Sequence, residues 1–262
     1  MPPLALVTGA SSGIGNAFAR RLASDGHDLI AVGRRKDRLD SLAASLPTTH
    51  VQVVVADLAT DEGVQTVAAL AASQPLSVLV NNAGVAHYMP FHELPAAKAR
   101  ELMHVKVTAP TVLTRAAVPG MIDRQAGTVI NVAGMLAFSG PAPAAAPRAQ
   151  RAIYTGTLAY TVAMTQTLHA ELEHTGVRVH VVCPGIVATE FHEIQGMDLS
   201  AVPRMTADDV VTATLAGIEL GETVIAPGVE DYSLIEHIFD ADLAAFGNQS
   251  PRLASRYHQQ QG

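Results

Sequence analysis

The sequence predicts a doubly wound α/β fold, in which helices cover both faces of a parallel sheet. Short apolar runs alternate with longer helical patterns along the 262 residues. Most of the runs are rich in Val, Ile and Leu with little polar alternation, which is typical of strands buried on both faces. Repeated strand–helix units of this kind favour a parallel sheet with right-handed crossovers, whose ligands bind beyond the carboxyl ends of the strands.

Seven apolar runs are expected to form the strands. Each is short enough for a strand, and helical patterns separate them along the chain. After the first run, for example, Ile14, Phe18 and Leu22 recur at helical spacing. The expected strands are Leu4–Val7, Asp28–Val32, Val51–Ala56, Leu76–Val80, Thr128–Val132, Val177–Val182 and Thr223–Ala226.

Composition limits the class of protein. The length allows one or two domains at about 150 residues each, and no change of composition marks a linker, so we expect a single domain over residues 1–262. The net charge of −7 argues against a nucleic-acid groove. The lone Cys183 fits a reducing compartment. With no basic leader and no apolar run near the roughly 20 residues that span a bilayer, we expect a soluble cytoplasmic protein.

Three segments depart from the strand–helix alternation. Ser139–Pro147 has three closely spaced prolines, which predicts a loop between the fifth strand and the next helix. Glu190–Met205 follows the sixth strand, and its mixed content indicates a mobile lid over the substrate. Residues 248–262 are expected to form a polar, loosely ordered tail.

A glycine-rich turn, Thr8–Gly15, joins the first strand to the first helix. Glycines permit positive φ and allow backbone N–H groups to approach a pyrophosphate, and the helix N-terminus adds partial positive charge. The alternative is a glycine turn that binds nothing, but the position between a strand and a helix favours a dinucleotide site. The residues expected to hold the phosphates are Gly9, Ser11, Ser12, Gly13, Ile14 and Gly15.

Two arginines, Arg34 and Arg35, follow the second strand. NAD-selective folds usually place a carboxylate near this point to hold the ribose 2′-hydroxyl, whereas arginines suit a 2′-phosphate. The pair therefore favours NADP(H) over NAD(H). The alternative is two solvated arginines at the start of a helix.

Four motifs occur in order at the ends of expected strands. They are Thr8–Gly15 (T-G-x-x-x-G-x-G), Asp57-Leu58, Asn81–Gly84 (N-N-A-G) and Pro184–Thr189 (P-G-I-V-A-T). Together they resemble the short-chain dehydrogenase/reductase family from Ala5 to about Pro227.

The resemblance implies a single Rossmann-type domain with a seven-stranded parallel sheet. It also implies a homodimer or homotetramer formed through long helices at about 98–120 and 150–174. Asp57 and Leu58 would contact the adenine, and the Pro-Gly motif would lie beside the nicotinamide. The further cofactor residues that it implies are Asn82, Ala83, Gly84, Tyr154, Pro184, Gly185, Val187 and Thr189.

The sequence departs from the family at three of four catalytic positions. Relatives use an Asn, a Ser, a Tyr and a Lys, of which only the tyrosine is retained, as Tyr154. Leu158 stands where the lysine of Tyr-x-x-x-Lys is expected, Gly134 replaces the serine and Lys106 replaces the asparagine. A phenol with no cation beside it keeps a pKa near 10, so Tyr154 would donate a proton but would be a poor base.

Lys106 offers a replacement for the missing cation. An ammonium directed toward Tyr154 could occupy the space beside the apolar Leu158. The alternative is an ordinary helix lysine whose tip lies in solvent. We therefore expect Tyr154 and Lys106 to be the catalytic residues.

These patterns predict an NADP-dependent oxidoreductase. It would reduce a carbonyl or oxidise an alcohol of an apolar small molecule, with Tyr154 as proton donor. Two alternatives are open: a catalytically impaired relative that binds NADP as a scaffold or partner subunit, and a non-redox lyase or isomerase. The eleven histidines show no metal-site spacing, so no metal is expected.

Overall fold

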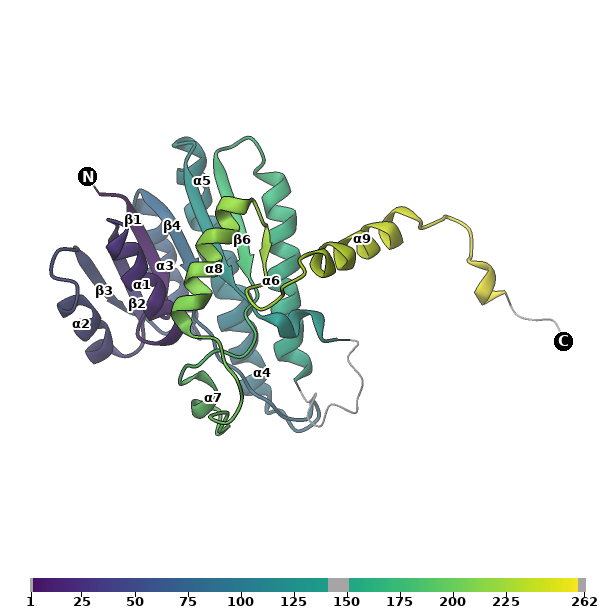
Figure 1. Cartoon of the computed structure of the whole chain (residues 1–262), viewed down its shortest axis with the longest axis horizontal. Helices are drawn as coiled ribbons and strands as arrows, with labels where there is room; N and C mark the ends of the chain where they lie inside the picture. Colours follow the sequence, from purple (N-terminus) through teal and green to yellow (C-terminus); the bar gives the residue numbers. More distant parts are fainter. Residues whose placement is uncertain (1, 141–150, 259–262) are drawn as a thin grey trace. The chain divides into compact units, whose positions relative to one another are not determined.

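The computed structural model describes residues 2–140 and 151–258. The chain divides into two compact units, Met1–Gly228 and Val229–Gly262. The larger unit contains the whole sheet, and most of its helices and strands are labelled in Figure 1.

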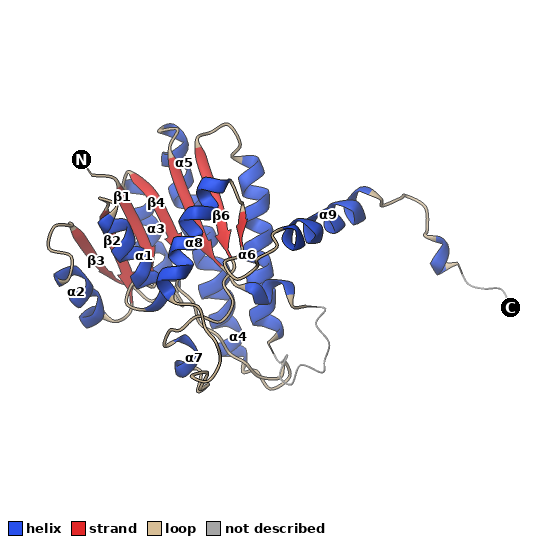
Figure 2. Ribbon diagram, in the orientation of Figure 1, coloured by secondary structure: helices blue, strands red, loops and turns tan. Residues whose placement is uncertain are grey.

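The sheet has seven parallel strands in the order β3-β2-β1-β4-β5-β6-β7 (Figure 2). Each expected apolar run forms one of them, so the predicted doubly wound α/β fold is confirmed. The strands are β1 (Leu4–Thr8), β2 (Asp28–Gly33), β3 (Val51–Val55), β4 (Leu76–Asn81), β5 (Gly127–Val132), β6 (Val177–Val182) and β7 (Val224–Ile225).

Helices cover the two faces of the sheet. Two separate apolar cores result: α1 and α8 pack on one face, and α3 and α5 pack on the other (Figure 1). The helices of this unit are α1 (Gly13–Ser24), α2 (Lys36–Ala44), α3 (Asp61–Ser73), α4 (Ala96–Met103), α5 (Ala109–Asp123), α6 (Ala152–Glu171), α7 (Phe191–Ile194) and α8 (Ala207–Leu220).

The strand order reverses beside β1, which lies between β2 and β4. At this point the carboxyl ends of β1 and β4 are joined by hydrogen bonds. The backbone N–H of Asn82 donates to Oγ1 of Thr8 at 3.0 Å, and Thr8 in turn donates to the carbonyl of Val80 at 3.2 Å. A reversal of this kind opens a crevice for a ligand, and here it lies next to the glycine-rich turn.

A turn of π-helix, His104–Thr108, joins α4 to α5 without a break. The chain therefore runs as one helical segment from Ala96 to Asp123, which corresponds to the long helix expected at about 98–120. The second expected helix, at about 150–174, is α6. A π-helical turn changes which side chains face inward, and here it carries the inward-facing Lys106.

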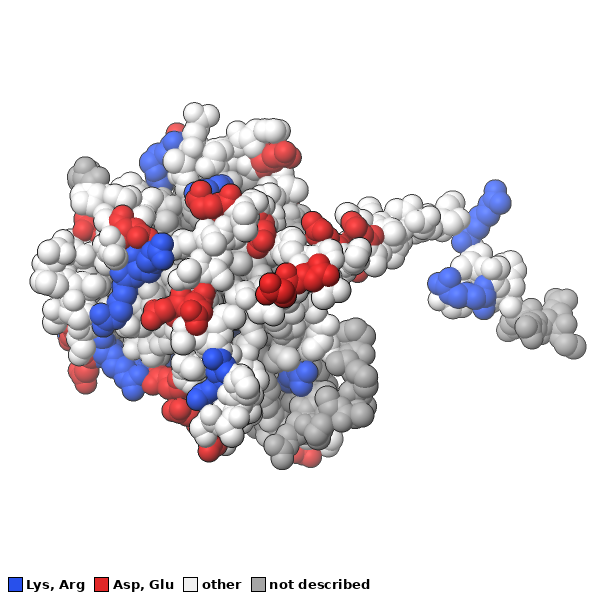
Figure 3. Space-filling view, viewed as in Figure 1, with Lys and Arg blue, Asp and Glu red and all other residues white. Residues whose placement is uncertain are grey.

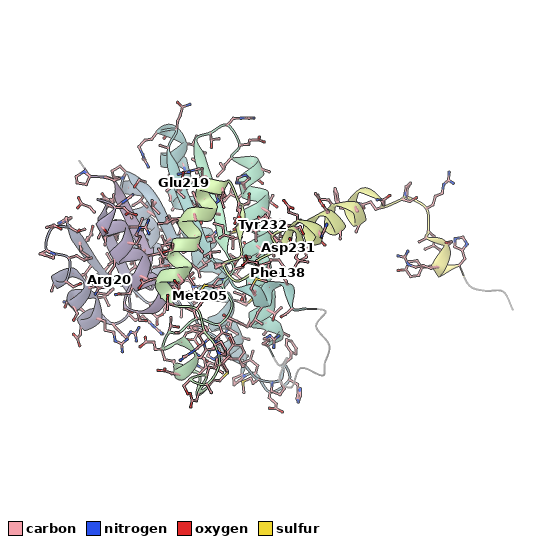
Figure 4. All side chains as sticks on the ribbon, in the orientation of Figure 1. Arg20, Phe138, Met205, Glu219, Asp231 and Tyr232 are labelled. Atoms are coloured by element: carbon pink, nitrogen blue, oxygen red, sulfur yellow. The ribbon has the colours of Figure 1, made fainter. Side chains whose placement is uncertain are left out.

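The expected lid, Glu190–Met205, contains the short helix α7. Its last residue, Met205 (Figure 4), forms a parallel bridge with Val187. A capping box of Thr206 and Asp209 then begins α8. The mobility of the lid stays a prediction. The expected proline-rich loop falls largely on residues 141–150, outside the described residues.

The smaller unit contains helix α9 (Ser233–Gly247) and a 3-10 turn, Ser255–Tyr257. The start of α9 is capped by Asp231, whose Oδ1 accepts the backbone N–H of Ser233 at 3.1 Å. Within the described ranges, no helix has the length and apolar character needed to cross a membrane.

Candidate active site

A cavity of about 920 Å³ opens at the carboxyl ends of the strands. This volume is large enough for a dinucleotide site with a substrate pocket beside it. Loops after β1 to β6 line it, together with the lid. All of the expected cofactor residues except Gly15 and Tyr154 are among the lining residues, so the structure brings the separate sequence motifs together.

The glycine-rich turn is shaped by close backbone packing. Gly9 and Gly13 have φ of 70° and 54°, a region that favours glycine. A Cβ on Gly9 would lie 2.7 Å from Nδ2 of Asn82, and one on Gly15 would overlap the carbonyl of Gly9. Gly15 therefore permits the turn to fold against β1 and β4, while Gly9 and Ser11–Ile14 line the cavity.

The wall of the cavity beside the glycine-rich turn is basic. Arg34 and Arg35 line it, as expected, and Nη2 of Arg35 donates to the hydroxyls of Ser11 at 3.0 Å and Ser12 at 2.7 Å. This contact fixes the guanidinium beside the phosphate-binding turn. Lys and Arg side chains form a band over this side of the larger unit, which includes the exposed Arg20 of α1 (Figures 3 and 4).

Glu190, the first residue of the lid, joins this basic wall. Its carboxylate pairs with Arg35 at 2.5 Å and with Arg38 at 2.6 Å. Partial burial would raise the pKa of Glu190, but hydrogen bonds from Arg38, Ser12 and Arg35 outweigh burial and lower the pKa to about 2. The carboxylate is therefore ionised throughout the physiological pH range. Sequence analysis missed both Arg38 and Glu190, although the run Arg34–Arg38 shows clustered basic residues.

Lys106 lies at the other end of the cavity. Its side chain is buried, and its Nζ donates to the carbonyl oxygen of Val132 at 3.4 Å. A Cβ on Gly84 would lie 3.1 Å from this Nζ, so the ammonium lies against the Asn-Asn-Ala-Gly loop. Burial lowers the pKa of Lys106 from 10.5 to about 8, so it is mostly charged at neutral pH. Lys106 is thus a cavity residue whose tip is withdrawn from bulk solvent.

Tyr154 is buried in the first turn of α6 and contacts Tyr88. Their rings form an edge-to-face pair with centroids 5.4 Å apart. Burial raises the pKa of Tyr154, and the charge and hydrogen bond of Tyr88 raise it further. Tyr88 lines the cavity, whereas Tyr154 is not among its described lining residues. Tyr88 follows the Asn-Asn-Ala-Gly motif with no pattern that could have identified it.

Gly134 and Leu158, at the two other positions where the family pattern predicts catalytic side chains, meet in space. Leu158 is buried in α6, and a Cβ on Gly134 would lie 3.7 Å from its Cδ1. Gly134 itself lines the cavity. The structure therefore has an apolar contact at the two positions where the family pattern predicts a serine and a lysine, and Lys106 is a buried cation that lines the same cavity. Within the described part of the chain, no cluster of His, Cys, Asp and Glu could hold a metal ion.

The remainder of the cavity wall is largely apolar. Residues after β4, after β5 and from the lid form it, next to Gly134 and Lys106. Its large apolar side chains are Val85, Met135, Leu136, Phe191, Ile194, Met197 and Leu199.

Comparison with known proteins identifies the family of this chain. Residues 3–198 match the short chain dehydrogenase family. The chain is 33% identical over 234 residues to the very-long-chain 3-oxoacyl-CoA reductase of Pyrenophora tritici-repentis, with 86% of this chain and 65% of that protein covered. The chain thus spans about two thirds of the length of this longer relative.

Two solved structures resemble the chain over almost its whole length. A short-chain dehydrogenase from Sphingobium yanoikuyae in complex with NADPH has a TM-score of 0.90 and 31% identity, with 97% of this chain and 100% of that chain covered. The bulky-bulky ketone specific alcohol dehydrogenase from Comamonas testosteroni has a TM-score of 0.86 and 28% identity, with 98% of each chain covered. Because the family match covers most of its length, this chain belongs to the short-chain dehydrogenase family of oxidoreductases.

Proposed function

We propose that the protein is an NADP(H)-dependent oxidoreductase that interconverts a carbonyl and an alcohol on an apolar small molecule. The observation that carries this proposal is the single cavity that joins a glycine-rich turn, a basic wall and the buried Lys106. The Sphingobium yanoikuyae relative, which is in complex with NADPH, supports the choice of cofactor.

The residues present fit NADP(H). The N-terminus of α1 and the turn Ser11–Ile14 would hold the pyrophosphate, because their backbone is open to the cavity and carries the positive end of the helix dipole. Arg34, Arg35 and Arg38 would hold the 2′-phosphate, and Asp57 with Leu58 would contact the adenine. Val187 and Thr189 would flank the nicotinamide. When bound, the cofactor supplies or accepts the hydride.

Lys106 is the preferred proton donor for carbonyl reduction. It lines the cavity, its pKa is lowered to about 8 by burial, and no carboxylate among the described residues raises that pKa again. A charged ammonium in this environment would stabilise negative charge on the substrate oxygen and transfer a proton to it. Loss of that proton leaves a neutral amine, which is the form that burial favours.

Tyr154, the proton donor expected from the family pattern, is a second candidate in this site. Its hydroxyl would act through Tyr88, which lines the cavity and shares a hydrogen bond with it. However, proton loss from Tyr154 would leave a buried phenolate, and burial already raises its pKa. Lys106 is therefore the better acid, and Tyr154 would hold Tyr88 against the substrate.

The substrate is proposed to be an apolar ketone or aldehyde. The apolar walls around Gly134 and Lys106 would exclude water and hold a hydrocarbon group. The Comamonas testosteroni relative is specific for bulky-bulky ketones, which supports a large apolar substrate.

A homodimer or homotetramer is proposed through α5 and α6. Exposed apolar side chains occur on these helices, among them Ile122 and Tyr160. The hydroxyls of Thr111 and Tyr160 lie 2.8 Å apart and align the two helices. Light scattering after size exclusion would give the mass in solution, and a monomer at micromolar concentration would contradict this proposal.

The test of the proposed function is a titration with NADPH and NADH, followed by absorbance at the nicotinamide band with a panel of apolar ketones. We expect NADPH to bind more tightly and to be oxidised only when a ketone is added. Tight NADPH binding without oxidation across the panel would favour a catalytically impaired binding protein. Product formation with no net change in NADPH would indicate a lyase or isomerase.

A further inference from the structure

We propose that Glu190 is a coenzyme-specificity residue that competes with the 2′-phosphate of NADP(H) for Arg35 and Arg38. The inference rests on the proposed NADP(H) dependence and extends it to the lid. Glu190 is distant in the chain from the start of α2, where Arg35 and Arg38 lie; it is separated from Arg38 by 152 positions.

The contacts of Glu190 are those that a phosphate would make. One carboxylate oxygen pairs with Nη1 of Arg35 at 2.5 Å, and the other accepts from Nη1 of Arg38 at 2.6 Å. Ser12, on the phosphate-binding turn, also hydrogen-bonds the carboxylate. The Glu190 side chain is only 25% exposed, and Glu190 lines the cofactor cavity. A carboxylate and a phosphate have the same preference for paired guanidinium donors.

The two anions cannot share these donors. A phosphate monoester carries a charge of about −1.5 to −2 at pH 7 and three strong acceptor oxygens, against one charge and two oxygens for the carboxylate. The phosphate would therefore displace Glu190 from Arg35 and Arg38. A coenzyme without the phosphate would leave Glu190 in place, and the ion pairs would continue to hold the lid.

Displacement of Glu190 would reach the substrate end of the cavity. Glu190 immediately precedes α7, and its carbonyl accepts the backbone N–H of Ile194 at 2.9 Å. Phe191 and Ile194 both line the cavity, and the ring centroids of Phe191 and Tyr154 lie 6.5 Å apart. Binding of a phosphate at one end of the cavity would therefore reposition apolar side chains at the other.

The experiment compares two nucleotides by calorimetry on the full chain: adenosine 2′,5′-bisphosphate and 5′-AMP, which lacks the 2′-phosphate. The variant is Glu190→Gln, which keeps the shape and removes the charge. The control is Glu193→Gln, which removes the same charge from an exposed position in α7, three residues after Glu190.

We expect Glu190→Gln to bind the bisphosphate about tenfold more tightly than the wild type, because a like charge has been removed from the phosphate site. Binding of 5′-AMP should change less than about twofold, and Glu193→Gln should leave both affinities unchanged. Unchanged or weaker bisphosphate binding by Glu190→Gln would overturn the inference. If the wild type instead binds both nucleotides equally, both this inference and the proposed NADP(H) dependence are wrong.

Hydrogen exchange at α7 provides a second measurement that needs no activity. Saturating adenosine 2′,5′-bisphosphate should speed exchange at the α7 amides, whereas 5′-AMP should not. In Glu190→Gln these amides should exchange quickly without any nucleotide. Slow exchange in that variant would show that Glu190 does not hold the lid.

Discussion

Gly134 and Leu158 lie against each other, at the two positions where the sequence motifs predict a serine and a lysine. A Cβ on Gly134 would lie 3.7 Å from Cδ1 of Leu158 and 3.5 Å from the carbonyl of Pro184, which are ordinary contact distances. The φ of Gly134, 164°, is extended backbone that any residue adopts. A small side chain therefore fits at this position without strain.

Gly134→Ser is expected to raise kcat/KM for ketone reduction about tenfold. The added hydroxyl would face the cavity and donate a hydrogen bond to the substrate oxygen, and one such donor contributes at least this much in other oxyanion sites. Steady-state kinetics with NADPH would measure the change. Gly134→Ala is the control, because it adds the same Cβ without a hydroxyl. Equal rates for the two variants would show that the hydroxyl does not reach the substrate.

Lys106→Met is expected to stabilise the fold at pH 7. The folded pKa of Lys106, about 8, is below the value of 10.5 for an exposed lysine. At about 1.4 kcal/mol for each pH unit, this difference corresponds to about 3 kcal/mol. Because the unfolded chain binds the proton more tightly, the cost is fully present below pH 8 and disappears as the pH rises toward 10.5.

Urea unfolding at neutral and alkaline pH would measure this effect. The advantage of Lys106→Met should shrink as the pH rises. Lys98→Met is the matched control, since the Lys98 side chain is 51% exposed and its ion pair with Glu101 lies at the surface. An advantage that does not change with pH would indicate that the methionine packs better, and not that a buried charge was removed.

The strands and the cofactor turn could be predicted because their signals are local. The short valine-rich run Val177–Val182 predicts a strand from its own composition, and the observed bounds of β6 are the same. The turn from Thr8 to Gly15 carries its own steric requirement for glycine. Site residues that directly follow a single strand can therefore be predicted once that strand has been located in the sequence.

Contacts between distant segments could not be predicted in this way. The pairing of Glu190 with Arg35 and Arg38 depends on how the lid crosses the cavity, and nothing in the lid sequence specifies that path. Similarly, burial of Lys106 depends on the π-helical turn at His104–Thr108, which shifts the inward face. Tyr88 lines the cavity and packs against Tyr154, which is another contact between segments that are distant in the chain.

The rate of ketone reduction is expected to fall as the pH rises through about 8. If charged Lys106 supplies the proton, its deprotonation removes both the proton and the positive charge at the substrate oxygen. The measurement is kcat/KM for reduction between about pH 6 and 10. Tyr154→Phe should keep the fall near pH 8, whereas Lys106→Met should be slow and lack it. Loss of the fall in Tyr154→Phe would return the role of proton donor to Tyr154.

Gly15 and Gly156 are expected to respond oppositely to the same substitution. A Cβ at Gly15 would overlap the carbonyl of Gly9 and contact Asn82, so Gly15→Ala should lose about 2 kcal/mol or more and weaken NADPH binding. Gly156 lies in α6 with nothing within 4 Å of its added Cβ, so Gly156→Ala should gain about 0.5–1 kcal/mol through helix propensity. Urea unfolding of both variants measures the difference. A small loss at Gly15 would mean that the turn can move away from Asn82, and NADPH affinity in that variant would then report whether the moved turn still holds the cofactor.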